Sequence, residues 1–426
     1  MAGRGRAPKR VVGLLLAGLT GLAGLTGLVG CGGSAGTDAA SAGVRQVLDR
    51  RAAAVRDGDE EAFVATAPPG SGATSERAGA RTEFRNRRAV PLTEWSYRVT
   101  GFHRSGARAT ADAELRYRIA GYDRAPVVTA RTLSLTRAEG RWYVSADRPA
   151  DDASRQLWEQ GAVVALHGEH SLVLGVGQSR GMLRGYAGLA DRAVPAVRQA
   201  WHGEWPGRIV VLVPESLEDM AELLGAPASG YRGIAAVTTG VVSEAKRRSP
   251  RSEGGERAGQ GPADRIIVNP DAYGVLGSFG RQVVLTHETT HVATRASTSA
   301  ATPLWLSEGY ADWVGYLGTG RTAAQAAPEL TRAVLDGRVP DALPEDGDFG
   351  FGGDAGKLAR AYESGWLACL MIAERWGEAR LGEFYRAVGA HEKRAGAVEA
   401  GLREVLDTSP EKFTELWREY LRERLV

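Results

Sequence analysis

The stretch that decides the fold is GRQVVLTHETTHVATR, residues 280–295. Within it, His287, Glu288 and His291 form the pattern His-Glu-x-x-His. Residues four apart on an α-helix lie one above the other on the same face, so both imidazoles can point at one metal ion with the carboxylate beside them. That arrangement is typical of zinc peptidases. The alternative is a surface helix with two unrelated histidines, and a chain with only seven histidines makes such a chance pair rarer.

Apolar residues extend the histidine face toward the start of the same segment. Val275, Phe279 and Val283 precede His287 and His291 at intervals of four residues. This spacing predicts a helix whose apolar stripe, together with the two histidines, faces the protein interior.

A second segment, LWLSEGYADW at 304–313, supplies further carboxylates. Pro303 ends a turn-forming stretch, so a helix, a turn and a second helix would bring Glu308 back towards the histidines. Hydrolytic zinc sites use three protein ligands and one open position, and Glu308 is the predicted third ligand of a Zn²⁺ ion. Asp312, on the same helix face, can accept a hydrogen bond from the outer nitrogen of a ligating histidine. Solvated helix charges are the alternative, but the flanking Leu, Trp and Tyr residues favour a buried helix.

These residues resemble the gluzincins, metallopeptidases with two histidines and one glutamate on zinc, and within them the M1 aminopeptidase-like and peptidase MA-like catalytic domains. The resemblance covers residues 278–377 and is carried by HETTH and WLSEGYAD. It implies that Tyr362, which opens the segment Tyr-Glu-Ser-Gly, donates a hydrogen bond to the tetrahedral intermediate. It also implies that the strand predicted for RIIVNP, residues 265–270, is a sheet edge along which an extended peptide pairs.

The chain departs from the family's pattern in three respects. Ser364 replaces the lysine of the family's Tyr-Glu-Lys-Gly motif, and the gap from His291 to Glu308 is slightly shorter than in the aminopeptidases. No Gly-x-Met-Glu-Asn-type segment, which those enzymes use to hold the substrate's amino terminus, lies upstream. The resemblance therefore supports zinc chemistry for this chain more strongly than it supports aminopeptidase specificity.

Residues 1–31 predict a targeting segment that does not belong to the fold. A basic start precedes the apolar run VVGLLLAGLTGLAGLTGLVG, which ends at Cys31. The ending Leu-Val-Gly-Cys resembles a bacterial lipobox, which implies lipid on Cys31 and a location on the outer face of the cytoplasmic membrane. A transmembrane anchor is the alternative, but the run is rich in Gly and Thr. Residues 32–41, small and polar, predict a flexible spacer.

The charge balance argues against a nucleic-acid partner, and the cysteine count argues against an internal disulfide bond. The chain of 426 residues has 53 basic and 51 acidic residues, and the four basic residues before Cys31 leave 49 against 51 in the remainder. This balance, with dispersed arginines, predicts no nucleic-acid partner. If Cys31 carries lipid, Cys369 has no disulfide partner, and we expect it to be a buried small apolar side chain.

The order of elements predicts an α+β protein with two domains. Residues 42–148 begin with helices, broken at Asp57-Gly58-Asp59, and continue as alternating strands, an order that resembles the NTF2-like fold. This domain could hold a ligand pocket or act as a spacer or partner-docking module. Residues 155–426 predict a mostly helical zincin domain with a small sheet, in which the charged, Gly- and Ser-rich residues 243–264 form a mobile insertion.

Together these features predict a membrane-anchored extracellular zinc metallopeptidase that hydrolyses peptide bonds, with Glu288 as general base for a zinc-activated water. One alternative is a cell-surface binding lipoprotein with an inactive zincin-like domain, and another is a zinc hydrolase of a non-peptide amide. Substrate identity, the choice between endopeptidase and aminopeptidase, and the oligomeric state stay open.

Overall fold

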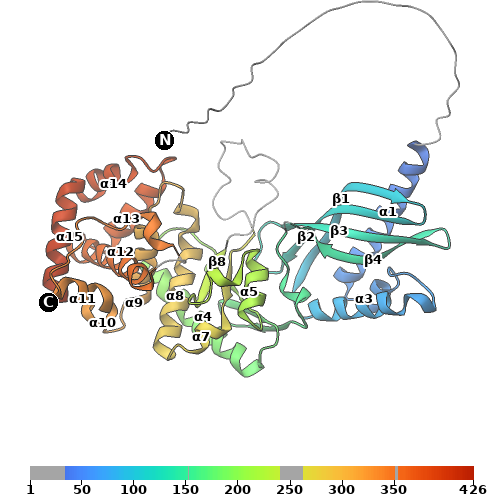
Figure 1. Ribbon diagram of the computed structural model, residues 1–426, viewed down its shortest axis with the longest axis horizontal. Helices are drawn as coiled ribbons and strands as arrows, with labels where there is room; N and C mark the ends of the chain where they lie inside the picture. The colour runs from blue at the N-terminus through green and yellow to red at the C-terminus, as the bar shows by residue number, and fades with distance from the viewer. Residues whose placement is uncertain (1–33, 152, 240–261, 351–353) are drawn as a thin grey trace, which may run out of the picture.

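The computed structural model describes residues 34–151, 153–239, 262–350 and 354–426. Three parts follow one another along its long axis: a four-stranded sheet with its helices, a five-stranded sheet, and a group of helices that ends the chain (Figure 1). The predicted α+β class, with an antiparallel sheet followed by a mostly helical region that contains a small sheet, is confirmed.

Two predictions concern residues outside these ranges. The targeting segment with its lipidated Cys31, and residues 243–261 of the expected mobile insertion, are not among the described residues. Within the described ranges, no helix combines the length and the apolar character needed to span a bilayer.

The amino-terminal part is an antiparallel sheet packed against a long helix. Its helices are α1 (Ser34–Asp57), α2 (Glu60–Val64) and α3 (Thr74–Arg87), and its strands, in their order across the sheet, are β1 (Leu92–Ser105), β2 (Arg108–Ile119), β3 (Val127–Ala138) and β4 (Arg141–Pro149). The helix break predicted at residues 57–59 is present, and the Asp59 side chain caps α2 by accepting a hydrogen bond from the Ala62 N–H.

Helix α1 is longer than the sequence indicates. It begins at Ser34, so residues 34–41 are helical where we predicted a flexible spacer. Ala40 and Val44 lie one turn apart, and both are buried in the cluster that α1 forms with Leu133 and Trp142 of the sheet. Packing against the sheet thus stabilises a helix in a stretch whose composition alone does not predict one.

The middle part is a mixed sheet with the strand order β5-β6-β7-β9-β8. Its strands are β5 (Val164–His167), β6 (Ser171–Gly175), β7 (Ile209–Val213), β8 (Ala236–Thr239) and β9 (Arg265–Val268). Strands β6, β7 and β9 run parallel, whereas β5 and β8 pair antiparallel at the two edges.

The expectation that residues 265–270 form a sheet edge is wrong. Strand β9 lies between β7 and β8, and all four of its residues are buried. A short run that is apolar on both faces suits a central strand, whose two faces are both covered. The edge is instead β8, which the sequence analysis did not predict.

Helices cover the middle sheet and form the rest of the chain. Those around the sheet are α4 (Arg180–Ala200), α5 (Leu217–Leu224) and α7 (Pro270–Gly274). The others are α8 (Ser278–Thr294), α9 (Leu304–Tyr316), α10 (Ala323–Ala326), α11 (Pro328–Leu335), α12 (Ala355–Trp376), α13 (Glu378–Gly389), α14 (Ala397–Leu406) and α15 (Pro410–Leu425). Their common core contains Trp305, Trp366 and Trp417, and Cys369 lies buried within it, as expected.

The apolar stripe predicted for α8 is only partly correct. Val275 directly follows α7 and is 85% exposed, and Phe279 in the first turn of α8 is 37% exposed. Only Val283 of the three is buried. The spacing of four crosses the boundary between two helices here, so the first two residues do not share the buried face of the histidines.

One continuous core joins the two sheets, although the predicted domain boundary falls between β4 and β5. Trp95 of β1 and Leu115 of β2 belong to the same buried cluster as Leu174 of β6 and Val210 of β7. A buried ion pair adds to this contact: the Arg265 guanidinium of β9 lies 2.9 and 3.0 Å from the two carboxylate oxygens of Asp123, between β2 and β3. The sheet that leads into α8 is thus fixed to the amino-terminal sheet.

Candidate metal centre

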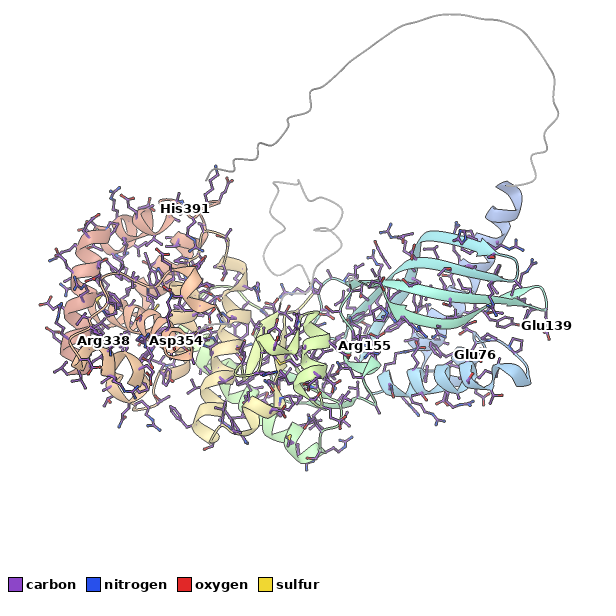
Figure 2. The ribbon with its side chains drawn as sticks, viewed as in Figure 1. Glu76, Glu139, Arg155, Arg338, Asp354 and His391 are labelled. Carbon is purple, nitrogen blue, oxygen red and sulfur yellow. The ribbon has the colours of Figure 1, made fainter. Side chains whose placement is uncertain are left out.

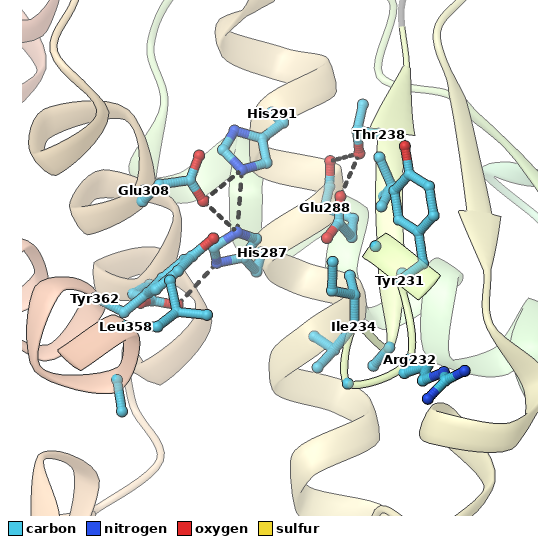
Figure 3. Close-up of a pocket in the computed structure, with 18 of the residues that line it drawn as sticks. Tyr231, Arg232, Ile234, Thr238, His287, Glu288, His291, Glu308, Leu358 and Tyr362 are labelled. Carbon is cyan, nitrogen blue, oxygen red and sulfur yellow. Dashed lines mark hydrogen bonds and ion pairs between the residues drawn. The ribbon is translucent and has the colours of Figure 1, made fainter. Parts of the chain in front are cut away.

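Helices α8 and α9 bring three potential metal ligands together. The Nε2 atoms of His287 and His291, one turn apart on α8, lie 3.0 Å from each other. The Glu308 carboxylate of α9 approaches them at 3.3 and 3.4 Å (Figure 3). This is the one group of three or more His, Cys, Asp or Glu within the described ranges whose ligand atoms are close enough to hold a metal ion. Two imidazole nitrogens and one carboxylate oxygen are a donor set that suits a catalytic zinc ion.

The electrostatics of the group favour a cation. Burial opposes ionisation of Glu308, but the adjacent His291 and His287 imidazoles outweigh it and hold the pKa of this carboxyl well below its usual range. Burial likewise lowers the pKa of His287, whereas Asp312 and Glu308 raise it more, and the net result is a pKa well above the ordinary value. A positive charge among these side chains is therefore stabilised.

Asp312 fixes the orientation of one imidazole. Its Oδ1 atom lies 2.8 Å from Nδ1 of His287, on the side of the ring away from Glu308. With Nδ1–H donating to the carboxylate, the lone pair of Nε2 is directed at the centre of the group. The structure thus places Asp312 where the sequence analysis expected it.

Close helix packing sets the position of Glu308. A Cβ atom on the neighbouring Gly309 would lie 2.3 Å from the carbonyl oxygen of Gly365 in α12, and a Cβ on Gly365 would lie 2.6 Å from that of Trp305. The two backbones can approach this closely only because both residues lack a side chain. Helices α9 and α12 therefore cross at a fixed point beside the group.

That crossing also places Tyr362, three residues before Gly365, in the same cavity as Glu308 (Figure 3). Burial, followed by the negative charges of Glu308, Asp312 and Glu288, raises the pKa of the Tyr362 phenol well above its usual value. The hydroxyl therefore stays protonated at neutral pH and can donate a hydrogen bond into the cavity.

Glu288 faces the cavity on the side of the histidines away from Glu308, and its side chain is buried. The Thr238 hydroxyl of β8 lies 2.6 Å from the Oε2 atom of Glu288 and 3.0 Å from its backbone carbonyl (Figure 3). Because each of these oxygens accepts and only Thr238 can donate, the carboxylate is held against the edge strand.

The group opens into a cavity of about 1150 Å³. One wall comes from α8, α9 and α12, and the other from residues 226–238, which end in β8. Arg232 lies on the second wall and is exposed, while Leu358 of α12 faces it from the first (Figure 3). A cavity of this volume can take a substrate larger than a single residue.

Sequence reasoning found the residues on the helices and missed those on the strand wall. His287, Glu288, His291, Glu308, Asp312 and Tyr362 all line the cavity. Thr238 was not predicted, because β8 has only four residues and takes its strand form from pairing with β9. The run of β-branched residues Val-Thr-Thr was the available signal.

Comparison with known proteins gives no family. No protein-family model matches the chain, and no curated protein matches it.

Solved structures that are similar to parts of the chain include two hydrolases and one protein of unknown function. Yeast LTA4 hydrolase is 11% identical with a TM-score of 0.35, over 66% of this chain and 42% of that protein. An M1 zinc metallopeptidase from Deinococcus radiodurans, determined with a Tyr-Ser-Ala substrate, is 12% identical with a TM-score of 0.32, over 78% of this chain and 61% of that one. Rv3472, a protein of unknown function from Mycobacterium tuberculosis, is 14% identical with a TM-score of 0.23, over 30% of this chain and 80% of that one. TM-scores this low establish neither fold nor function for this chain.

Proposed function

We propose that this protein is a zinc-dependent peptidase. The observation that carries the proposal is the convergence of His287, His291 and Glu308 within 3.0–3.4 Å of one another in a cavity that the Glu288 carboxylate also lines. These three side chains would hold a zinc ion, which would supply a Lewis acid and lower the pKa of water towards about 7.

The chain's own residues suit the remaining steps of peptide hydrolysis. Glu288 would take a proton from the attacking water and pass it to the leaving amine. The protonated Tyr362 hydroxyl is placed to donate a hydrogen bond to the oxyanion of the tetrahedral intermediate, and one such donor is typically worth about 3–4 kcal/mol. Asp312 keeps the His287 imidazole in its ligand orientation.

An extended peptide is the substrate class that the strand wall fits best. Among the described residues, strand β8 pairs with β9 on one side only, and it lines the cavity with Val237 and Thr238. The free edge of a strand offers backbone N–H and C=O groups to a second extended chain. Main-chain pairing of this kind favours a peptide over a small non-peptide amide.

We place this activity on the outer face of the cytoplasmic membrane. The lipobox-like ending at Cys31 supports a lipid anchor there. Incorporation of labelled palmitate into the wild type, and its loss in Cys31→Ser, would test the anchor separately from the activity.

The test of the proposed function is the variant Glu288→Gln. After a peptide library has identified a substrate of the wild type, the variant should cleave that peptide about 10²–10⁴-fold more slowly. Zinc content should remain about one ion per chain in both proteins, because Glu288 is not a ligand.

Two outcomes would contradict the proposal. Near-full activity of Glu288→Gln would remove the general base from the mechanism. Absence of zinc and of any cleaved peptide in the wild type would favour a binding lipoprotein with an inactive zincin-like domain.

A further inference from the structure

A second cavity, of about 530 Å³, lies at the end of the amino-terminal sheet that points away from α8. It is lined by residues 40–50 of α1 and by residues at the turns that join β1 to β2 and β3 to β4. In Figure 2, Glu139 marks the tip of the β3–β4 turn. The side chains that matter for its chemistry are Gln46, Arg50, Arg104, Arg137, Arg141 and Trp142.

The cavity gathers positive charge without a counter-charge. Four arginines line it, and no aspartate or glutamate does. Among the described residues, none of the four has a carboxylate oxygen within 4.0 Å, and Arg104 donates only to the carbonyl of Gly106 in its own turn, at 3.0 Å. All four arginine side chains are exposed, and an anion bound among them would be stabilised by their positive charge.

Other arginines of the same sheet behave differently. Arg98 of β1 forms an ion pair with Glu114 of β2, and Arg131 of β3 pairs with Asp147 of β4 at 2.7 Å. The arginines of the cavity differ from these two in having no carboxylate partner among the described residues.

The floor of the cavity is apolar and fixed. Trp142 is buried, and Phe102 packs edge-on against its ring at a centroid distance of 6.4 Å. Gly43 of α1 lies so close that a Cβ atom there would be 2.9 Å from the indole ring. A ligand with an anionic group joined to an apolar body would match the arginine rim and the indole floor together.

We propose that this cavity binds the phosphate group of an anionic phospholipid and docks the amino-terminal sheet on the membrane surface. Helix α1 begins at Ser34, three residues after Cys31, and Ala40 lines the cavity. At a rise of 1.5 Å per residue, Ala40 lies only about 9 Å along α1 from its first residue. A lipid on Cys31 would therefore hold the arginines within reach of the headgroups.

The test uses the chain from Gly32 onward, which retains every described helix and strand and removes the apolar leader. It is mixed with vesicles of phosphatidylglycerol and phosphatidylcholine in equal parts, or of phosphatidylcholine alone, and bound protein is measured by flotation. We expect binding to the mixed vesicles only, and weaker binding as salt is added.

Two variants examine the cavity itself. The double change Arg50→Gln and Arg141→Gln should lower affinity for the mixed vesicles about 30-fold. Gln46→Glu puts a carboxylate one helical turn before Arg50 at the cavity, where it would pair with the arginines, so it should also lower the affinity without weakening the fold. The matched control is Arg180→Gln with Arg184→Gln on α4, which removes the same charge from exposed positions elsewhere.

The control protein should bind as the wild type does. Equal losses in the cavity and control proteins would overturn the proposal, because general charge would then explain binding. Inorganic phosphate, added to the chain without vesicles, distinguishes a second source of the same chemistry. If phosphate protects the wild type from thermal unfolding while the mixed vesicles do not bind it, the cavity serves a soluble phosphate compound and the membrane assignment is wrong. The choice of a membrane as partner rests on the proposed lipid anchor at Cys31, and it does not rest on peptidase activity.

Discussion

The two walls of the metal-centre cavity are built in different ways. On the helical wall, α9 and α12 meet backbone to backbone at Gly309 and Gly365, and this contact fixes Glu308 and Tyr362. On the strand wall, β8 reaches the centre through one hydroxyl, that of Thr238, which holds Glu288. Metal binding should therefore depend on tight packing of the first wall, whereas the second wall should affect turnover with the metal still in place.

The largest effect should come from Gly365→Ala. The new methyl group would lie 2.6 Å from the Trp305 carbonyl oxygen, so α9 and α12 must separate. We expect the free energy of unfolding to fall by about 1–3 kcal/mol. Zinc content should fall with it, because Glu308 moves. Denaturant unfolding and metal analysis measure the two changes.

A glycine in open space provides the control for this variant. In α4, Gly185 is exposed, and a Cβ there meets nothing within 4 Å. Gly185→Ala should stabilise the protein by about 1 kcal/mol through helix propensity. Wild-type stability and zinc content in Gly365→Ala would disprove the fixed crossing.

Asp312→Asn should weaken metal binding without loosening the helices. The carboxylate that orients His287 becomes a neutral amide of the same shape, and such changes beside a metal ligand cost about 10–100-fold in affinity. Competition with a chromogenic zinc chelator measures this affinity. Asp336→Asn, at an exposed position after α11, is the control. Equal affinities in the two variants would show that the contact is incidental.

Thr238→Val should leave zinc bound and slow catalysis. Loss of a hydrogen bond to a carboxylate corresponds to about a 10-fold decrease in kcat. Thr238→Ser, which keeps the hydroxyl, should restore most of the activity. A change in KM with kcat unaltered would instead assign Thr238 to substrate binding.

The smallest effect concerns Glu363, on the side of α12 that faces α11. Its carboxylate accepts hydrogen bonds from the N–H groups of Glu329 and Leu330 at 3.2 and 2.5 Å. Burial nevertheless raises its pKa to about 7 from the ordinary 4.5. The folded protein therefore binds this proton more tightly than the unfolded chain, and the resulting stability is full below the unfolded pKa and is lost as pH rises through about 7.

Comparison of wild type with Glu363→Gln isolates this contribution. Between pH 5 and pH 8, the free energy of unfolding of the wild type should fall by about 1 kcal/mol more than that of the variant. Chemical unfolding at a series of pH values provides the measurement. Parallel pH profiles for the two proteins would exclude Glu363 as the titrating group.

Local patterns in the sequence were sufficient to place the helical side of the site. His287 and His291 share a face through helix periodicity, and the turn before α9 returns Glu308 to them. The same reasoning failed where structure depends on partners distant in sequence. Strand β8 exists through its pairing with β9, and the central position of β9 follows from the crossing of strands in the sheet.

Helix α3 shows a related limit. Its sequence is TSERAGARTEFRNR, and among its described side chains only Ala80, Phe84 and Arg87 are buried. So few apolar residues give no clear helical period. The packing of Phe84 against Phe63 of α2 buries one face of the helix, which the apolar pattern alone does not predict.

The core shared by the two sheets limits how far the cleft can move relative to the amino terminus. The Asp123–Arg265 pair and the cluster around Trp95 prevent the amino-terminal sheet from swinging independently of the sheet that leads into α8. A chain tethered at its amino terminus would therefore keep its cleft at a fixed distance from the start of α1. Bonds within that distance of the tethering surface would be accessible, and chemically identical bonds farther away would not.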